Sequence, residues 1–187
     1  SWETIVNDGQ IGLLERLPIE MAQKAAGKED EEVTKQLITP SGVNTTNFNA
    51  TNQNVISGNP ALTLDSLEAA IDAVNRQTYN GKLINPITQF ALVVPRSLEL
   101  QARKILAIQE VRTESTINSV TQTTISGNPI ATSINVVVND WLTRINSGAG
   151  DFWYLIPVPS QQLNPGVSLG FLRGYETPEM RIKANGG

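Results

Sequence analysis

Carboxylates are the side chains in this sequence best suited to catalysis or metal binding. Glu29 to Glu32 form an acidic run, and Asp140 and Asp151 lie beside aromatic residues that could raise a carboxyl pKa. Successive residues of a helix point in different directions, so the acidic run cannot converge on one ion. The sequence also has no His and no Cys to complete a catalytic couple. We therefore predict no catalytic, cofactor-binding or metal-binding residues, and we interpret the acidic run as a solvated helix face.

Glycines and aromatic residues in the second half have two interpretations each. The glycines could form a phosphate cradle, but neither GxGxxG nor GxxxxGK[ST] occurs, and turns or bulges explain them. They are Gly148, Gly150, Gly166, Gly170 and Gly174. Trp141, Trp153 and Tyr154 could stack on bases or sugars. Because Trp153 and Tyr154 lie in an apolar run, we favour core packing or a subunit contact.

The densest basic cluster consists of Arg96, Arg103, Lys104 and Arg112. It could contact nucleic acid, but the formal net charge of −4 argues against a surface devoted to a polyphosphate. Ion pairs with the acidic helix of another subunit are an equally good interpretation.

The first half predicts two helices before a polar stretch. Asp8 can cap a segment that carries Ile11, Leu14 and Leu17 and is interrupted at Pro18. Pro18 suits the first turn of a new, long helix over Ile19 to Ile38. A loop or ordered meander rich in Asn, Thr and Ser follows from Asn44 to Asn59.

A third helix with a buried stripe is predicted next. Leu67, Ile71 and Val74 recur at helical spacing, Asp65 and Glu68 resemble a capping box, and the helix should end near Asn80 and Gly81.

The clearest packing unit runs from Phe90 to Ala107. Phe90 to Val94 is a continuous apolar run, which predicts a strand buried on both faces and ended by Pro95. Ser97 could then cap an amphipathic helix on which Glu99 and Arg103 form an i,i+4 ion pair.

The remaining chain is rich in predicted strands. Arg112 to Asn128 shows no period and is interpreted as a flexible loop. Ile134 to Val138 and Phe152 to Ile156 are predicted strands, with a short helix capped by Asp140 between them. Strands are also predicted for Val167 to Leu172 and Met180 to Lys183, so the fold class is α+β.

Composition narrows the class of protein further. With 187 residues the chain can form one good core, and without Cys it can form no disulfide. No apolar run approaches about 18 residues and the start shows no export signal, so we expect a soluble protein without a membrane partner. The first residue is Ser, so we expect processing, trimming or a missing leader.

Four motifs in order resemble one protein family. LVVPRSLELQARKIL at Leu92 to Leu106 resembles the segment LVVPxxLExxARxIL of tailed-phage major capsid proteins, especially the major head subunits of Mu-like phages. The other three agree in order and cover the chain from about Gly9 to its end. They are SLEAAIDAV at Ser66 to Val74, WYLIPVP at Trp153 to Pro159 and LRGYETPEMRIK at Leu172 to Lys183.

The resemblance implies the phage capsid fold of the Hong Kong 97 type. Residues 1–45 would belong to a peripheral lobe with Ile19 to Ile38 as its long spine helix. Residues 46–180 would form an axial lobe, a mixed sheet flanked by helices, and 181–187 would return toward the peripheral lobe. The loop Arg112 to Asn128 would lie near the capsomer axis. The family's N-terminal arm, extended hairpin and last C-terminal strand appear absent from this sequence, so we expect an incomplete subunit.

The implied function is structural. Copies of the chain would assemble as hexamers and pentamers into an icosahedral shell around a double-stranded DNA genome, in the host cytoplasm, and remain in the virion. Scaffold, portal or decoration proteins would be further partners, and packaged DNA would be contacted weakly and without sequence specificity. Two alternatives stay open: an encapsulin-type cellular shell around an enzyme cargo, and a glycan-binding or other interaction module.

Overall fold

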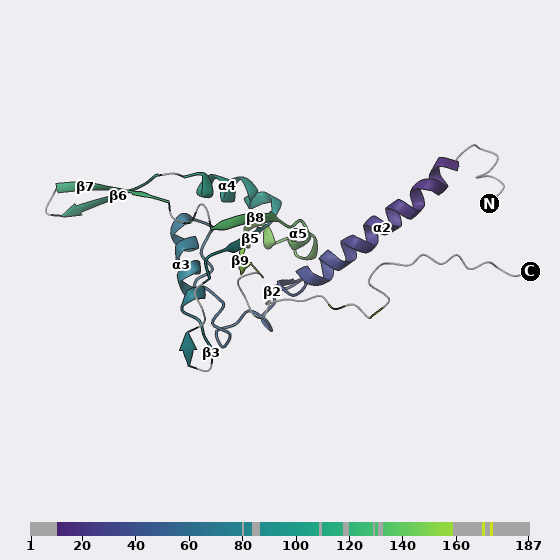
Figure 1. The fold of residues 1–187 in the computed structure, drawn as a ribbon, viewed down its shortest axis with the longest axis horizontal. Helices are drawn as coiled ribbons and strands as arrows, with labels where there is room; N and C mark the ends of the chain where they lie inside the picture. Colours follow the sequence, from purple (N-terminus) through teal and green to yellow (C-terminus); the bar gives the residue numbers. More distant parts are fainter. Residues whose placement is uncertain are drawn as a thin grey trace, which may run out of the picture. The chain divides into compact units, whose positions relative to one another are not determined.

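The computed structural model describes residues 11–79, 81–83, 87–108, 110–117, 120–128, 130, 133–158, 170 and 173. The chain divides into two compact units: Ser1–Thr34 with Val167–Gly187, and Lys35–Gly166. Figure 1 labels the helices and strands along the chain. The predicted cap Asp8 and the predicted strands Val167 to Leu172 and Met180 to Lys183 lie outside the described residues, apart from Gly170.

One long helix replaces the two helices predicted near the N-terminus. Helix α2 (Ile11–Thr34) has 24 residues and contains Pro18 in its interior, so the prediction of a break there was wrong. Proline removes one backbone donor at a cost of about 3 kcal/mol, which helical residues on both sides can offset. The helix ends at Thr34 and not at Ile38, because Ile38 instead belongs to a short hairpin of β1 (Ile38–Thr39) and β2 (Gly42–Val43).

The polar stretch from Asn44 to Asn59 contains no helix or strand, and asparagine side chains hold its turns. Asn44 Nδ2 donates to the Lys35 carbonyl at 3.0 Å, and Asn54 Nδ2 donates to the Asn47 carbonyl at 2.8 Å. Phe48 packs against a buried cluster described below. The prediction of an ordered meander is confirmed.

Helix α3 (Leu64–Asn75) begins at a different cap from the predicted one. Thr63 and Ser66 form the capping box, with the Ser66 amide donating to Thr63 Oγ1 at 3.1 Å. The predicted pair Asp65 and Glu68 was wrong because the N-cap, Thr63, lies two residues before Asp65. The helix also ends at Asn75, before a small hairpin of β3 (Thr78–Tyr79) and β4 (Lys82–Leu83).

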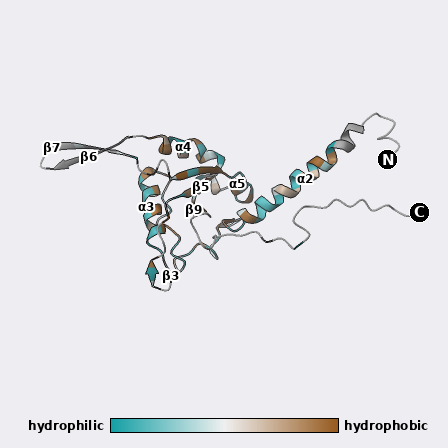
Figure 2. Cartoon of the chain, viewed as in Figure 1, coloured by the Kyte–Doolittle hydropathy of each residue, from teal (hydrophilic) through white to brown (hydrophobic). Residues whose placement is uncertain are grey.

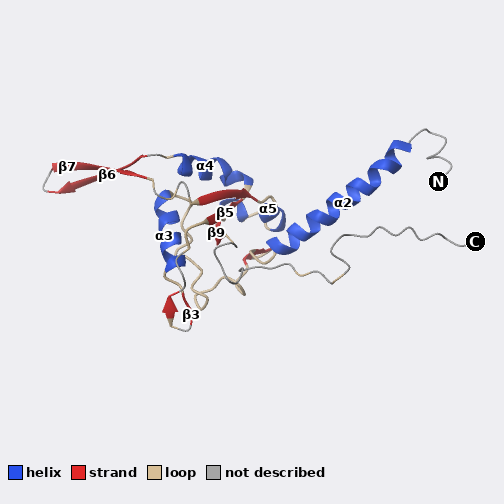
Figure 3. Ribbon diagram, viewed as in Figure 1, coloured by secondary structure: helices blue, strands red, loops and turns tan. Residues whose placement is uncertain are grey.

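The central sheet has three strands in the order β8-β5-β9. Strand β5 (Phe90–Val94) pairs in parallel with β8 (Ile134–Val138) and antiparallel with β9 (Tyr154–Pro157). In Figure 3 this mixed sheet lies among helices α3, α4 (Glu99–Ala107) and α5 (Trp141–Ile145).

Both faces of β5 are buried, as predicted. Phe90, Leu92 and Val94 belong to a cluster that includes Leu67 of α3 and Ala102 of α4. Val93 belongs to a second cluster with buried residues from α5 and its surroundings, which are Leu37, Ile38, Leu142, Ala149 and Tyr154. Figure 2 shows the corresponding hydrophobic character of β5 and β8.

Ser97 does not cap α4, so that prediction was wrong. Pro95 ends β5 and a short 3-10 helix, η1 (Arg96–Leu98), leads directly into α4 without a side-chain cap. Ser97 Oγ instead donates to the Gly150 carbonyl at 2.6 Å. The predicted Glu99–Arg103 pair is confirmed, with 3.0 Å between Oε1 and Nε.

A β-hairpin replaces the flexible loop predicted from Arg112 to Asn128. Strands β6 (Glu110–Ile117) and β7 (Val120–Gly127) pair antiparallel along their full lengths. The sequence of the hairpin lacks the apolar alternation of a half-buried strand, which is why it was not predicted as strands, although Thr and Val favour strands.

The last described elements follow the predicted order with shifted bounds. Strand β8 matches Ile134 to Val138, and α5 matches the predicted short helix. A 3-10 helix, η2 (Ala149–Asp151), precedes β9, which begins at Tyr154 and not at Phe152. Helices together with a small mixed sheet confirm the α+β class.

Candidate functional site

Two carboxylates of the acidic run, those of Glu31 and Glu32, make ion pairs with a lysine of the same helix. Lys28 Nζ lies 2.9 Å from Glu31 Oε2 and 3.2 Å from Glu32 Oε1. Asp151 is exposed at the end of η2. Within the described ranges, no three His, Cys, Asp or Glu side chains come together as a metal-binding group.

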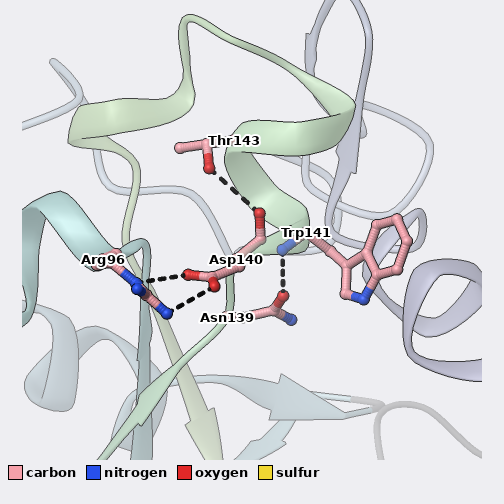
Figure 4. A network of polar contacts seen from close by, with 5 residues as sticks. All are labelled: Arg96, Asn139, Asp140, Trp141 and Thr143. Carbon is pink, nitrogen blue, oxygen red and sulfur yellow. Dashed lines mark hydrogen bonds and ion pairs between the residues drawn. The ribbon is translucent and has the colours of Figure 1, made fainter. Parts of the chain in front are cut away.

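Asp140 lies in a polar network that joins the ends of β5 and β8 to α5 (Figure 4). Arg96 Nη2 contacts Asp140 Oδ2 at 2.9 Å, and Arg96 Nε contacts Oδ1 at 3.3 Å. The Asp140 carbonyl accepts a hydrogen bond from Thr143 Oγ1 at 3.2 Å. The carboxylate is thus held by a guanidinium in a two-point geometry, which orients the residue that leads into α5.

The predicted side-chain cap by Asp140 was wrong, since its carboxylate makes no cap hydrogen bond. Asn139 takes this role, because its Oδ1 accepts from the Trp141 amide at 2.9 Å. Asn and Asp have similar preferences at helix starts, so the dipeptide Asn139–Asp140 marked the position without deciding which residue caps it. Arg96 follows β5 and Asp140 follows β8, so the pairing of these two strands brings the two side chains together.

The aromatic residues at β9 pack in the interior. Trp153 is half-buried against the first core cluster and donates from Nε1 to the Pro60 carbonyl at 3.0 Å. Tyr154 is buried in the second cluster, and its ring centroid lies 5.5 Å from that of Phe48. The preference for core packing over stacking on a ligand is confirmed for both residues.

Tyr154 also has the clearest electrostatic perturbation in the described chain. Its hydroxyl donates to the Leu37 carbonyl at 3.2 Å. Burial disfavours the charged phenolate and raises the pKa of Tyr154 from 10.0 to about 12. The residue is therefore a neutral structural donor at ordinary pH and does not serve as a base.

Trp141 is half-buried, and Arg144 covers one of its faces. The guanidinium carbon lies 4.9 Å from the ring centroid, which is within range of a cation–π contact. This contact occupies the ring face on which a base or a sugar would otherwise stack.

The predicted basic cluster is partly neutralised within the same unit. Arg96 pairs with Asp140, and Arg103 pairs with Glu99, although both guanidinium groups remain mostly exposed. Lys104 is exposed. The side chain of Arg112 lies outside what the structure describes, and the other three members of the cluster lie on η1 and α4.

The glycines whose surroundings are described serve turns. The Gly148 amide donates to Asn146 Oδ1 at 2.8 Å, and the Gly150 carbonyl accepts from Ser97. Gly166 and Gly174 lie outside the described residues. The Gly148 N–H, the kind of group that a phosphate cradle would need free, is therefore already engaged by Asn146.

An open depression lies where α4 meets the outer edge of β8. It has a volume of about 300 Å³ and is lined by Arg103, Leu106, Ile134, Asn135 and Val136. Its only charged lining group is the Arg103 guanidinium, which pairs with Glu99. The lining suits contact with another polypeptide better than acid–base chemistry on a small molecule.

In the described part of this α+β chain, the candidate binding site is thus an open surface depression. A family model described as phage capsid protein matches residues 1–187, and the chain belongs to this family. It is a structural capsid protein that associates with copies of itself and is a component of the virion. Comparisons with curated proteins and with solved structures returned no match.

The motifs that resemble the capsid family occupy the central sheet and its helices. SLEAAIDAV lies in α3, LVVPRSLELQARKIL spans β5, η1 and α4, and WYLIPVP includes β9. LRGYETPEMRIK lies outside the described residues except Arg173. None of the described helices combines the length and apolar character needed to cross a membrane.

Proposed function

We propose that this chain is a major capsid subunit that assembles as hexamers and pentamers into an icosahedral shell around a double-stranded DNA genome. The family match over residues 1–187 carries this proposal. The α+β unit around β5 and the separate long helix α2 are consistent with an axial lobe and a spine helix. Assembly would take place in the host cytoplasm, before the genome is packaged.

The domain assignment belongs to the same proposal. Residues 1–45 would contribute the spine helix of a peripheral lobe, 46–180 would form the axial lobe, and 181–187 would return toward the peripheral lobe. The division of the chain after Thr34 supports a separate lobe for the long helix.

The mechanism would be cooperative burial of surface between copies. Each contact can be modest, because closed symmetry repeats it and each subunit is held by several neighbours at once. A catalytic group is not required for this function. Scaffold, portal or decoration proteins would be further partners.

Contacts to packaged DNA would be weak and independent of sequence. The net charge of −4 opposes a polyphosphate, and Arg96 and Arg103 already have carboxylate partners. We expect a variant with Arg103→Glu and Lys104→Glu to retain nuclease-protected DNA in intact shells. Loss of DNA from shells that still form would overturn this part of the proposal.

Electron microscopy and sedimentation of the expressed chain test the main proposal. Capsomers or closed shells are the expected result, with nuclease-protected DNA in shells recovered from infected cells. A strict monomer at high concentration would contradict the proposal, and an enzyme cargo in place of DNA would favour a cellular shell.

A further inference from the structure

The two outer strands of the central sheet differ in the backbone groups that they present to solvent. Among the described residues, β8 and β9 each pair with β5 alone. Along a strand, the backbone N–H and C=O groups of successive residues point alternately to the two sides. The register of each strand pair therefore decides which N–H groups point toward β5 and which point outward.

On β8 the outward groups belong to alternate residues. The Phe90 amide donates to the Ser133 carbonyl at 2.8 Å, and the Asn139 amide donates to the Val94 carbonyl at 2.9 Å. With Leu92 opposite Val136, this parallel register directs the N–H and C=O groups of Asn135 and Val137 toward β5. The backbone groups of the residues between them point outward, and these residues are Ile134, Val136 and Val138.

Strand β9 is protected in a way that β8 is not. The Val158 amide donates to the Gln89 carbonyl at 3.1 Å, so Pro157 and Leu155 occupy the outward positions of the antiparallel pair. Pro157 has no N–H, which leaves only the amide of Leu155 to donate outward from β9. Proline at an edge blocks the addition of another strand, and β8 contains neither proline nor a charged residue.

The outer edge of β8 is also accessible and largely apolar. It borders the open depression, in which Leu106 of α4 lies beside Ile134 and Val136. The half-buried Val136 and the 40% exposed Val137 could be covered further by an added strand. An unprotected edge of this kind is a hazard for a protein that must remain a monomer, but it is useful to one that associates with its own copies.

We propose that β8 is an assembly edge, to which a second copy of this chain adds a β-strand along the depression beside α4. This inference rests on the proposed function, because the bound strand comes from another capsid subunit. The added strand would accept and donate hydrogen bonds at Ile134, Val136 and Val138, and its side chains would cover Leu106 and Val136.

A matched pair of proline variants tests the proposal. Val136 and Leu155 flank the same residue, Leu92, from opposite sides, and both are half-buried with outward N–H groups. Both variants therefore keep the hydrogen bonds to β5 and lose similar packing. We expect Val136→Pro to reduce the assembled fraction about tenfold or more, and Leu155→Pro to assemble like the wild type once folding is confirmed by circular dichroism.

A second pair covers the case in which a proline variant does not fold. Asn135→Lys adds a charge to the exposed face of β8, whereas Gln89→Lys adds the same charge at an exposed position before β5. Only Asn135→Lys should impair assembly. Normal assembly of folded Val136→Pro or Asn135→Lys would overturn the assembly edge.

Hydrogen exchange provides a direct readout of the added strand. In the free subunit the amides of Ile134, Val136 and Val138 should exchange quickly, while those of Asn135 and Val137 should be protected. Shell formation should slow the first group about tenfold or more. If wild-type shells form and these amides still exchange quickly, the assembly edge is refuted while the capsid function stands; if wild-type shells do not form, the capsid function itself fails.

Discussion

Tyr154 offers the sharpest test of the packing described for the central unit. Its hydroxyl is buried and donates to the Leu37 carbonyl at 3.2 Å, while its ring lies against Phe48. Replacing Tyr154 with Phe removes this donor and its ionisable group but keeps the ring. The variant therefore isolates the hydroxyl from the hydrophobic contribution of the side chain.

Two features of the structure set the expected magnitude. The distance of 3.2 Å exceeds the value of about 2.8 Å that is usual for hydroxyl donors. The Leu37 carbonyl also accepts from the Asn44 amide at 3.1 Å, so it keeps one partner in the variant. We therefore expect Tyr154→Phe to lower the free energy of unfolding by about 0.5–1 kcal/mol near neutral pH.

The pH dependence of this difference tests the raised pKa. Tyr154 has a pKa of about 12 in the folded chain and 10.0 as the reference value for the unfolded chain. Below pH 10 both states hold the proton, and between pH 10 and 12 the unfolded state releases it first. Wild-type stability should therefore fall with rising pH in this window by more than the hydroxyl contributes near neutral pH, so the gap between wild type and Tyr154→Phe should narrow and then reverse.

Urea unfolding of the unassembled subunit at several pH values between 8 and 11 measures this gap. Trp153→Phe is the control, because it removes the half-buried donor to Pro60 but no titratable group. Its difference from wild type should stay constant with pH. A gap for Tyr154→Phe that is equally constant from pH 8 to 11 would refute the assignment of a buried, neutral tyrosine to this position.

Three further substitutions test other parts of the fold by the same urea measurement. Thr63→Ala should destabilise the subunit by about 1 kcal/mol, because it removes the side-chain acceptor of the α3 capping box; no change would mean that another group caps the helix. Asp140→Asn should cost less than about 1 kcal/mol, since Arg96 is 77% exposed and the pair is screened by solvent, and a larger loss would show that the network does more than orient α5. Phe90→Ala should cost about 3–5 kcal/mol, because Phe90 is 2% exposed in the first core cluster; a loss below about 1 kcal/mol would contradict the described core.

The sequence was sufficient to predict those features that depend on the residues of a single segment. The apolar run Phe90 to Val94 predicted a strand buried on both faces, and the two core clusters do bury both faces. The Glu99–Arg103 pair followed from helical spacing alone. The order of the four motifs was enough to indicate a phage capsid protein, which the family match then showed.

Features that depend on contacts with another segment, or on where an element begins, could not be predicted from the sequence. Thr63, and not Asp65, caps α3 because the cap depends on where the chain enters the helix. The β6–β7 hairpin escaped prediction because its sequence has no apolar period, and only the register of its two strands reveals it. Pro18 lies inside a continuous helix because the segments on both sides are helical and one missing donor does not outweigh them.

The sequence by itself determined which segments are apolar enough to build the core and which family the chain resembles, because both depend on residue type and order. Only the tertiary structure decided that Arg96 binds Asp140, that the ring of Tyr154 packs against Phe48, and that β8 and β9 are the outer strands of the sheet among the described residues. Which backbone groups of a strand are bonded and which point outward is decided only when the strand pairs with another in a fixed register. Within the part of the chain that the structure describes, the pairing that places β5 at the centre of the sheet therefore leaves an edge without proline or charge on β8 and a proline on the edge of β9.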